Sequence, residues 1–505
     1  MDRNSTDRET VSDLTEYDHF VDGSYQPSAG AERIDVTYPY TGAVWASVPN
    51  GTPADVDAAV EAANRVFTDT WGQTRASTRR RILNQIADTT DEYANELTAL
   101  ETRGNGKLIR EMGAQMRALG DWYRYYASLC DTIEGRVIPT ENKDGAFFTY
   151  TRREPLGVVG MITPWNSPLL LTTFKLAPAL AAGNTVVHKP SEVTPVSALR
   201  FAELLATQTD LPDGVYNVVT GDGNQTGAAL TSHEAVDKLA FTGSTDVGRT
   251  VGHAAAERVI PVTLELGGKS PNIVFPSASL ENAVTGIVKG IFAATGQTCL
   301  AGSRVLVHES ITSDLVDQLV DRAESITLGD PMDPETEMGP VAFPAQAEMI
   351  DGYLEVATDE GATVATGGDR AEALPGECFI QPTVLTDVDN EMRVAREEIF
   401  GPVVSLIAFE DEAEAIDIAN DTPFGLAAGV WTEDLRQAQR VASAIEAGTI
   451  WVNEYRTLSY KAPFGGYNAS GLGRENGEEG LDAYLQTKTV WIDQSGEVTD
   501  PFTLG

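Results

Sequence analysis

Residues 157–190 read "GVVGMITPWNSPLLLTTFKLAPALAAGNTVVHKP". The apolar run 157–162 has the composition of a buried strand, and a loop bounded by two prolines follows it. The next apolar segment, 169–183, is long enough for a helix, and 184–190 is a second apolar run. Strand, helix and strand in this order predict a βαβ unit with two parallel strands.

The same alternation continues to residue 266. Apolar runs at 214–219, 238–242 and 261–266 predict three further strands. One helix is expected to start at Thr194 as its N-cap, another to follow the strand 214–219, and another to cover 245–258. Five strands alternating with four helices predict a parallel, doubly wound sheet. Such sheets bind ligands at the carboxyl ends of their strands.

A second alternation of strands and helices follows residue 266, and further helices are expected before residue 157. Strands are expected at 270–275, 304–309, 403–409 and 449–453, with helices at 280–294, 313–325 and 411–420. Upstream, 19–50 reads as short strands and turns, and helical periodicity covers 53–68, 76–102 and 107–130. No Gly/Ser-rich linker separates the two alternations, so we expect their domains to share a tight cleft.

The predicted fold class is α/β, with two doubly wound domains and a small β extension. Residues 1–18 are expected to be a disordered acidic tail. The first domain combines 19–135 with 157–266, and the second covers 267–465. A hairpin at 136–156 and a strand within 485–505 fall outside both sheets and could pair with another subunit's edge. This predicts a homodimer or homotetramer.

The charge of the chain excludes some partners. The formal net charge is −39 over 505 residues, and only nine of the basic residues are lysines against 27 arginines. Such a charge repels nucleic acid and anionic membranes. Acidic excess with few lysines favours a protein of molar salt, where the Debye length is only ~3 Å. An ordinary acidic enzyme is the alternative.

Cysteine and histidine usage gives little sign of metal binding. The three cysteines show no CxxC spacing and the five histidines form no HxxxH pair, so we expect no metal site and no disulfide scaffold. The polar, acidic N-terminus has no signal-peptide pattern, and no apolar run reaches the ~18 residues of a membrane span. These features favour a cytoplasmic protein without a membrane partner.

Three residues are candidates for nucleophilic chemistry. Cys299, in "FAATGQTC", is either a small core side chain or a nucleophile. Asn166, in "PWNSP", has an amide stiffened by two prolines, which suits oxyanion stabilisation, although a turn asparagine is the common reading. Alternation along 261–266 turns Glu265 away from Leu264. A buried Glu is costly unless it is paired or working.

Other stretches suggest a nucleotide site. In "FTGSTDVGR" Gly243 permits close backbone approach, and Ser244 or Thr245 opens a helix whose N-terminus can bind phosphate, or simply caps it. In "HKPSE" Lys189 and Glu192 could bracket ribose hydroxyls, or form a solvated pair. "GDGNQTG" is one residue too long for a dinucleotide fingerprint, and "GGKS" lacks the first glycine of a P-loop.

Taken together, these stretches resemble the aldehyde dehydrogenase superfamily from about residue 20 onward. The resemblance is carried by motifs that occur in the family's order: "PWNSP", "HKPSE", "FTGST", "LELGGKSPNIV", "GQTC", "EEIFGPV", "PFGG" and "SGLGRE". Each motif is weak alone, and the ordered set is specific. The resemblance implies that the first domain binds NAD and that the second is catalytic.

The resemblance also implies roles for individual residues. Cys299 would be the nucleophile, Glu265 the general base, and Asn166 with the Cys299 N–H the oxyanion hole. Glu475 would be a more distant proton acceptor. The cofactor-binding residues would be Ile162, Thr163, Pro164, Trp165, Lys189, Glu192, Gly243, Ser244, Glu398 and Phe400, with Lys189 and Glu192 on the adenine ribose and Glu398 on the nicotinamide ribose.

The implied reaction is oxidation of an aldehyde to a carboxylic acid with NAD, through a Cys299 thioester that water hydrolyses. Positive charge and N–H groups are expected to lower the thiol pKa. A CoA-acylating relative, a catalytically silent relative and a thiol hydrolase are the rivals. The first usually lacks the glutamate at 265, the second would have lost Cys299, Asn166 or Glu265, and the third needs a histidine partner. Tyr460 and Trp451 are expected near the substrate tunnel, and the aldehyde itself stays open.

Overall fold

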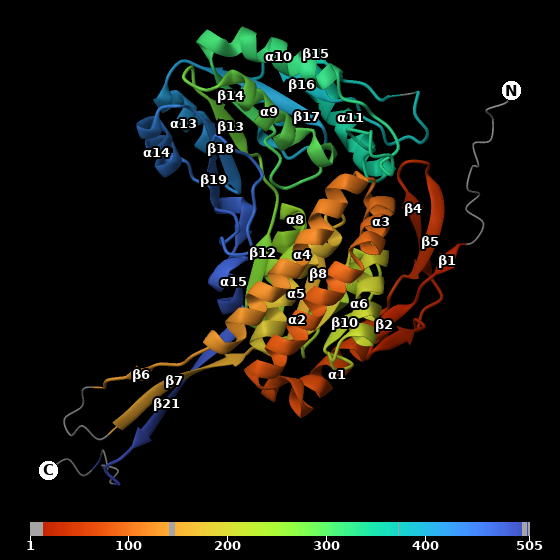
Figure 1. The fold of residues 1–505 in the computed structure, drawn as a ribbon, viewed down its shortest axis with the longest axis vertical. Coiled ribbons are helices and arrows are strands. Elements are labelled where there is room, and N and C mark those ends of the chain that lie inside the picture. Colours follow the sequence, from red (N-terminus) through yellow and green to blue (C-terminus); the bar gives the residue numbers. More distant parts are fainter. Residues whose placement is uncertain (1–13, 141–146, 372, 497–501, 503–505) are drawn as a thin grey trace.

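The computed structural model describes residues 14–140, 147–371, 373–496 and 502. Most of the expected tail, part of the hairpin turn and most of the residues after 496 therefore lie outside the described residues. Two lobes, each built on a sheet, stand one above the other, and a narrow arm projects from the lower lobe (Figure 1). This confirms the α/β fold class with two doubly wound parts and a small β extension.

The first sheet carries the five predicted parallel strands. Its order is β20 (Gly471–Leu472), β12 (Val262–Glu265), β11 (Lys238–Thr242), β8 (Val158–Thr163), β9 (Thr185–Pro190), β10 (Tyr216–Val218), β2 (His19–Val21) and β3 (Ser24–Gln26). From β8 the chain winds outward through β9 and β10 and then returns to β11 and β12 on the other side. The switch point between β8 and β11 is where such sheets bind ligands.

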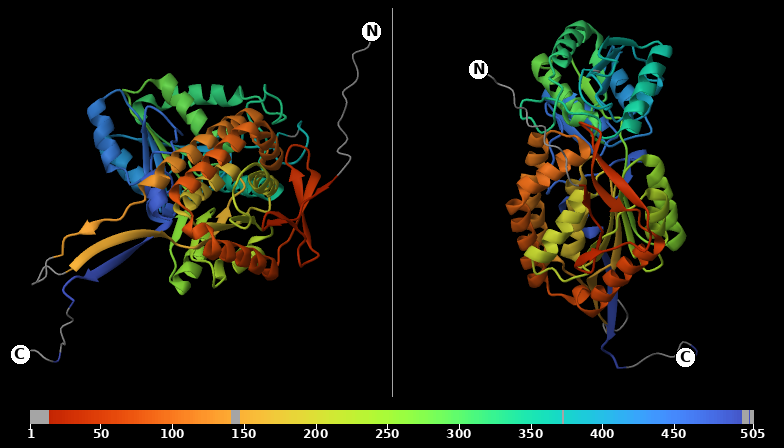
Figure 2. Two further views of the ribbon diagram at one scale, coloured as in Figure 1. Left: turned by 60° about the horizontal axis from the view of Figure 1, so that its bottom comes forward. Right: turned by 90° about the vertical axis from the view of Figure 1, so that its right-hand side faces the viewer.

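Alternate side chains of these strands pack against helices on both faces of the sheet. Val158, Val187 and Leu239 belong to one apolar cluster, whereas the neighbouring Val159 and Val186 belong to another. The right-hand view of Figure 2 shows the sheet edge-on, with one layer of helices on each side. The helices are α1 (Pro53–Asp69), α7 (Ala228–Ser232) and α8 (Thr245–Arg258) on one face, and α5 (Pro168–Ala182) and α6 (Val196–Gln208) on the other, backed by α2 (Ala76–Glu92), α3 (Ala94–Asn105) and α4 (Ile109–Leu129).

The second sheet has seven strands around the upper lobe. Its order is β15 (Thr363–Thr366), β16 (Thr383–Thr386), β17 (Val403–Phe409), β14 (Arg304–His308), β13 (Pro271–Val274), β18 (Ala427–Trp431) and β19 (Thr449–Val452), and only β15 is antiparallel to its neighbour. Its helices are α9 (Leu280–Ile291), α10 (Thr312–Glu324), α11 (Pro344–Asp359), α12 (Arg393–Arg396), α13 (Glu412–Asn420) and α14 (Leu435–Ala444).

Two small sheets and a few short turns complete the chain. β1 (Thr15–Glu16), β5 (Ala43–Pro49) and β4 (Arg33–Tyr38) form one sheet; β21 (Leu485–Asp493), β7 (Phe147–Pro155) and β6 (Val137–Ile138) form the arm. α15 (Gly477–Asp482) packs beside α5. The short helical turns are η1 (Trp71–Gln73), η2 (Cys130–Thr132), η3 (Gly223–Gly227), η4 (Ala293–Gly296), η5 (Glu309–Ile311) and η6 (Asn468–Ser470).

Several expected boundaries differ from the structure. Thr15–Glu16 pair with β5, so the expected tail does not reach residue 18. The helix expected over 76–102 is two helices that meet at Tyr93, and the helix after "HKPSE" has Pro195 rather than Thr194 at its N-cap. Residues 471–472 return to the first sheet, because β20 pairs with β12 beyond the expected end of the second domain. No helix among the described residues is long and apolar enough to cross a membrane.

Candidate active site

A cavity of about 530 Å³ lies between the carboxyl ends of β8, β11 and β12 and the second sheet. It is lined by eight of the residues expected from the sequence: Pro164, Trp165, Asn166, Gly243, Ser244, Cys299, Glu398 and Phe400. Ile162, Thr163, Lys189, Glu192, Glu265 and Glu475 do not line this cavity. The cavity therefore joins the loop with the candidate nucleophile to the loops expected to hold a cofactor.

The loop before Cys299 is held in an unusual conformation. The expected helix 280–294 ends at Ile291, and Ala294, Thr295 and Gly296 follow with φ of +57°, +55° and +69°. A Cβ on Gly296 would lie 2.0 Å from the Gly401 carbonyl oxygen, so only glycine fits there. Backbone with positive φ at residues other than glycine is strained. It persists where surrounding contacts hold it in place, and this is common at functional sites.

Hydrogen bonds fix this loop against both lobes. The Asn166 amide Nδ2 donates to the Gln297 carbonyl oxygen at 3.1 Å. The Gln297 side chain accepts from the Ala342 N–H at 2.9 Å, and Thr295 Oγ1 donates to the Gly339 carbonyl at 3.2 Å. An Asn amide has a second N–H. Among the described residues the Cys299 N–H has no acceptor. The second amide N–H of Asn166 and the Cys299 N–H are therefore both available to a ligand oxygen.

The Cys299 thiol is not activated by its surroundings as the sequence suggested. Burial raises its pKa to about 12, and the carboxyl groups of Glu398 and Glu265 add to the rise, while Lys107 opposes it. The expected lowering of the pKa is therefore wrong for the free protein. The motif predicted Cys299 as the nucleophile, but it could not predict that two carboxyl groups would raise the pKa of its thiol.

Glu265 ends β12 and is buried, with neither carboxyl oxygen hydrogen-bonded within the described part of the chain. Burial raises its pKa well above the usual range, and Glu475 adds to this while Lys175 and Arg474 oppose it. A Cβ on Gly465 would lie 2.8 Å from Glu265 Oε1, so the glycine keeps room for the carboxyl group. A buried carboxyl group with a raised pKa has the properties of a general base or acid.

Glu475 lies behind Glu265 in a second buried cluster. Its carboxylate accepts a hydrogen bond from the Lys175 ammonium, which also donates to Thr242 Oγ1 at 2.6 Å. The backbone of Glu475 pairs with Phe464. Lys175 is the one basic residue in the apolar helix α5, and that interruption of "LLLTTFKLAPALAAG" was the sequence signal that could have identified it.

Lys189 and Glu192 form an ion pair at the end of β9. The Lys189 Nζ to Glu192 Oε2 distance is 3.0 Å, and the lysine side chain is buried while the glutamate is exposed. Thr163 Oγ1 bonds His188 Nε2 at 2.8 Å, which ties the ends of β8 and β9 together, and Ile162 lies in β8. A Lys–Glu pair at strand ends beside the cavity is a donor and an acceptor for ribose hydroxyls.

The N-terminus of α8 faces the cavity. Ser244 is its N-cap and accepts a hydrogen bond from the Val247 N–H at 3.5 Å. The Gly243 N–H donates to the Glu265 carbonyl oxygen at 3.1 Å, which joins this loop to β12. A free helix N-terminus of this kind binds phosphate through its N–H groups and its dipole.

The loop with Glu398 and Phe400 closes the cavity from the second lobe. The Gly268 N–H donates to Glu398 Oε1 at 3.1 Å, and the Phe400 ring meets the Trp165 ring edge-on at 5.2 Å. Gln346, which the sequence did not single out, donates to the carbonyl oxygens of Ile399 and Phe400 and fixes this loop. No motif signalled Gln346, because its partners are backbone groups distant in sequence.

The donor set fits a dinucleotide. A helix N-terminus that can bind phosphate and the half-buried carboxyl group of Glu398 line one cavity, and the Lys189–Glu192 pair lies outside its lining, at the end of β9. A Cβ on Gly267 would lie 2.3 Å from Glu398 Oε2, so the glycine leaves a cradle around that oxygen. Among the described residues no group of His, Cys, Asp or Glu side chains is arranged to hold a metal ion.

Sequence comparison finds a family for almost the whole chain. A sequence model of the aldehyde dehydrogenase family matches residues 25–490. An aldehyde dehydrogenase of Emericella nidulans is 46% identical over 472 residues, which cover 93% of this chain and 94% of the relative. A (Z)-2-((N-methylformamido)methylene)-5-hydroxybutyrolactone dehydrogenase of Acinetobacter baylyi is 41% identical over 495 residues, 97% of this chain and 100% of the relative.

Solved structures agree with this match. The betaine aldehyde dehydrogenase of Staphylococcus aureus in complex with NAD⁺ superposes with a TM-score of 0.94 at 40% identity, over 97% of each chain. The NAD⁺ complex of an aldehyde dehydrogenase from Bacillus cereus superposes with a TM-score of 0.92 at 43% identity, over 95% of this chain and 96% of that one.

Proposed function

The chain belongs to the aldehyde dehydrogenase family, and on that premise we propose that it oxidises a small aldehyde to its carboxylic acid with NAD through a thioester on Cys299. One observation carries this proposal. Cys299, the Asn166 amide, the N-cap of α8 and Glu398 all line one cavity. A nucleophile and an oxyanion donor thus share a space with groups that suit a dinucleotide.

NAD is the cofactor, and when bound it supplies the hydride acceptor. The chain's residues hold its parts separately. Ser244 and the N-terminus of α8 would bind the pyrophosphate, Lys189 and Glu192 the adenine ribose, and Glu398 the nicotinamide ribose. Ile162, Thr163, Pro164 and Trp165 form the end of β8 and the loop along which the cofactor would lie, with Phe400 opposite Trp165.

The first chemical step adds the Cys299 sulfur to the aldehyde carbonyl. The thiol must lose its proton, and its raised pKa in the free protein means that a base has to accept that proton on demand. We take Glu265 as that base: its carboxyl group, like that of Glu398, is close enough to raise the thiol pKa, and Glu398 is assigned to the cofactor. The oxyanion that forms is stabilised by the second Asn166 N–H and the Cys299 N–H.

Loss of hydride converts the tetrahedral adduct into a thioester, and water must then cleave the carbon–sulfur bond. Glu265 takes a proton from that water, the oxygen attacks the thioester carbonyl, and the sulfur leaves and regains a proton. We propose that Glu475, which accepts a hydrogen bond from Lys175, takes the proton from Glu265 and so restores it as a base. The products are the carboxylic acid, NADH, one proton and the free enzyme.

Rival activities fit the site less well. A CoA-acylating enzyme has no need of a buried carboxyl group beside the thioester, and Glu265 is present. A silent relative would be expected to lack one of Cys299, Asn166 or Glu265, and all three surround the site. A thiol hydrolase needs a base such as histidine beside the sulfur, and the described histidines have other neighbours: His19, His188, His233 and His308 are bonded or paired elsewhere, and His253 lies in α8.

Tyr460 and Trp451 do not line the cavity of about 530 Å³, and their place beside the path of the aldehyde stays a prediction. Tyr460 packs edge-on against Trp122 at 5.5 Å, and Trp451 donates from Nε1 to the Thr457 carbonyl oxygen at 2.9 Å. Relatives are named for betaine aldehyde and for a hydroxybutyrolactone, so charged and uncharged aldehydes both belong in the test. We propose a cytoplasmic homo-oligomer.

The proposed function is tested with a panel of aliphatic, aromatic, amino and quaternary ammonium aldehydes, assayed for NADH formation in molar KCl. At least one should be oxidised, and Cys299→Ser should form no NADH with it. A wild-type protein that binds NAD yet oxidises none of the panel would contradict the proposal.

A further inference from the structure

Lysine is scarce in this chain, yet five of the nine lysines are buried: Lys107, Lys175, Lys189, Lys238 and Lys269. Burying an ammonium group is costly unless it is compensated. Lys269 is 1% exposed, and within the described residues its Nζ has no hydrogen-bond or ion-pair partner. Its charge therefore acts at a distance on a neighbour or serves a bound molecule.

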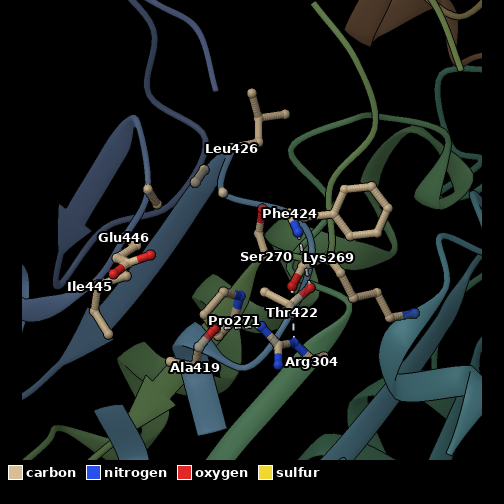
Figure 3. A pocket seen from close by; sticks show the side chains of 13 residues that line it. Lys269, Ser270, Pro271, Arg304, Ala419, Thr422, Phe424, Leu426, Ile445 and Glu446 are labelled. Atoms are coloured by element: carbon tan, nitrogen blue, oxygen red, sulfur yellow. Dashed lines mark hydrogen bonds between the residues drawn. The ribbon is translucent and has the colours of Figure 1, made fainter. Parts of the chain in front are cut away.

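The backbone of Lys269 is anchored from below. Arg304 Nε donates to the Lys269 carbonyl oxygen at 3.0 Å, and its other nitrogens donate to the carbonyl oxygens of Ile418 and Ala419 at 2.9 Å, at the end of α13. Figure 3 shows the Lys269 side chain leaving this region and running away from Arg304. The cavity drawn there holds about 10 Å³, the lower limit for one water molecule, so it is no ligand site.

Residues 267–269 surround the carboxyl group of Glu398. Gly267 has no side chain that would meet Glu398 Oε2, and the Gly268 N–H donates to Glu398 Oε1 at 3.1 Å. A Cβ on Gly268 would also lie 2.7 Å from the Cys299 carbonyl oxygen, so the same tripeptide passes beside the nucleophile. Lys269 is the third residue of this tripeptide, and its ammonium group is the only charged side-chain group of the three residues.

The other charged groups near Glu398 and Lys269 already have partners. Glu397 accepts hydrogen bonds from Arg393 and from the Tyr353 hydroxyl, Arg396 pairs with Asp421 and Glu391, and Arg304 is bonded to three carbonyl oxygens and to Asn390. Lys269 is the cation that remains, in the described part of the chain, to balance the half-buried Glu398.

We propose that Lys269 is a positioning residue that keeps Glu398 a carboxylate, so that Glu398 can accept hydrogen bonds from the hydroxyls of the nicotinamide-side ribose of NAD. This inference rests on the proposed function, because it takes Glu398 as the group that holds that ribose. Lys269 itself does not touch the cofactor and acts through Glu398.

The electrostatics support this assignment. Burial raises the pKa of Glu398 to about 7, against the lowering effects of the Gly268 N–H and of Lys269. Burial and Arg304 lower the pKa of Lys269 to about 7, against the raising effects of Glu398 and Glu397. Loss of the ammonium removes an effect that lowers the Glu398 pKa, so the carboxyl group of a Lys269→Met variant should hold its proton to higher pH.

The test is NADH binding, followed by NADH fluorescence from pH 6 to pH 9 in molar KCl without substrate. Wild-type affinity should weaken below a midpoint near the Glu398 pKa of about 7. Lys269→Met should move this midpoint up by about one pH unit and weaken binding roughly fivefold at pH 7. The effect should persist in molar salt, because buried charges are little screened.

Three controls separate this role from a merely structural one. ADP lacks the second ribose, so its affinity should not change in Lys269→Met. Lys238→Met removes another buried lysine, at the far end of β11, and should leave the NADH midpoint in place. In a Glu398→Gln background, adding Lys269→Met should have no further effect. Lys269→Gln replaces the methionine variant if the latter does not fold.

An unchanged midpoint in a folded Lys269 variant that still binds ADP would overturn the inference and leave the proposed function standing. A wild-type protein that binds neither NADH nor ADP would instead overturn the proposed function, and the inference with it.

Discussion

The Cys299 thiol lies in surroundings that keep it protonated in the free protein. Burial, Glu398 and Glu265 all raise its pKa, and the Lys107 side chain opposes them. A thiol held in this way is protected from oxidation, because the thiolate is the reactive form. If Cys299 acts as the proposed nucleophile, a base or ligand binding must generate its thiolate when substrate is present.

This predicts the reactivity of the free enzyme. Alkylation of Cys299 by iodoacetamide without NAD should accelerate about tenfold per pH unit from pH 7 to pH 9, with no plateau, because the thiol pKa is about 12. Mass spectrometry of the modified peptide measures the rate, and Cys130 and Cys378, whose pKa values burial raises to about 11, serve as internal references. A plateau near pH 8 would show a thiol of ordinary pKa.

Glu192 carries a prediction about cofactor choice. Its carboxylate pairs with Lys189 at 3.0 Å and should accept hydrogen bonds from a ribose 2′-hydroxyl while repelling a 2′-phosphate. We expect NAD to be strongly preferred over NADP, and Glu192→Thr to narrow the gap in kcat/KM. Equal use of both cofactors by the wild-type protein would remove Glu192 from this role.

At the residue scale, the sequence showed the candidates that belong to motifs and missed those defined by tertiary contact. Eight of the expected residues line one cavity, because each follows a strand end or lies in a tight turn. Gln346 lies in no motif, because its partners are backbone groups far along the chain. Lys269 lies in the motif "LELGGKSPNIV", but the motif assigned it no role, because only the structure shows that its ammonium group is buried without a bonded partner in the described part of the chain.

At the scale of elements, the arm is a separate sheet of β21, β7 and β6 that projects from the lower lobe (Figure 1). β21 pairs with β7 along its whole length, and β6 covers only a short part of β7. Trp491 is 58% exposed and Val137 67%, and Phe147 and Phe148 are also exposed. A sheet of three strands with exposed apolar side chains and free edges is typical of a surface that pairs with another subunit.

The arm therefore predicts a homodimer or homotetramer. Light scattering in molar KCl should give a multiple of the 54.1 kDa chain mass, and Trp491→Glu should lower the mass by weakening the apolar contact. Leu435→Glu, at a 72% exposed position in α14, is the matched control and should not change it. A monomeric wild-type mass would contradict this role for the arm.

Elements were predicted well where apolar periodicity was strong. The five strands of the first sheet and four strands of the second were expected from their apolar runs. The helix break at Tyr93 and the end of α9 at Ile291 were not, because the residues around them keep helical periodicity. Tertiary contacts determine where α9 ends: the Ala294 N–H donates to Glu111 and Gly296 lies against Gly401.

At the scale of the whole molecule, charge is the dominant feature. The net charge of −39 stays after surface arginines pair with carboxylates, and such exposed pairs contribute only ~0–1 kcal/mol each. Self-repulsion of this size destabilises a compact chain at low ionic strength and is relieved when salt screens it.

We therefore expect both melting temperature and activity to rise from dilute buffer to molar KCl. Differential scanning fluorimetry and NADH formation over a KCl series measure this, with sucrose as a control for effects other than screening. Full stability in dilute buffer would contradict adaptation to salt and would leave the enzymatic proposal untouched.

The central claim is that the reaction has two halves joined by a thioester, with Cys299 required for both and Glu265 needed most in the second. Glu265→Gln should retain part of hydride transfer and slow hydrolysis by ~10²–10⁴, as loss of a general base does. Cys299→Ser should give no NADH at all.

Rapid mixing of Glu265→Gln with NAD and an accepted aldehyde is the most direct test. We predict at most about one NADH per active site, then a slow steady state, with an acyl group on Cys299 detected by mass spectrometry. If Glu265 also accepts the thiol proton, as proposed, the burst will be slower than in the wild type. Turnover at the wild-type rate, with no acyl group on Cys299, would contradict the account and make Glu475 the base to test.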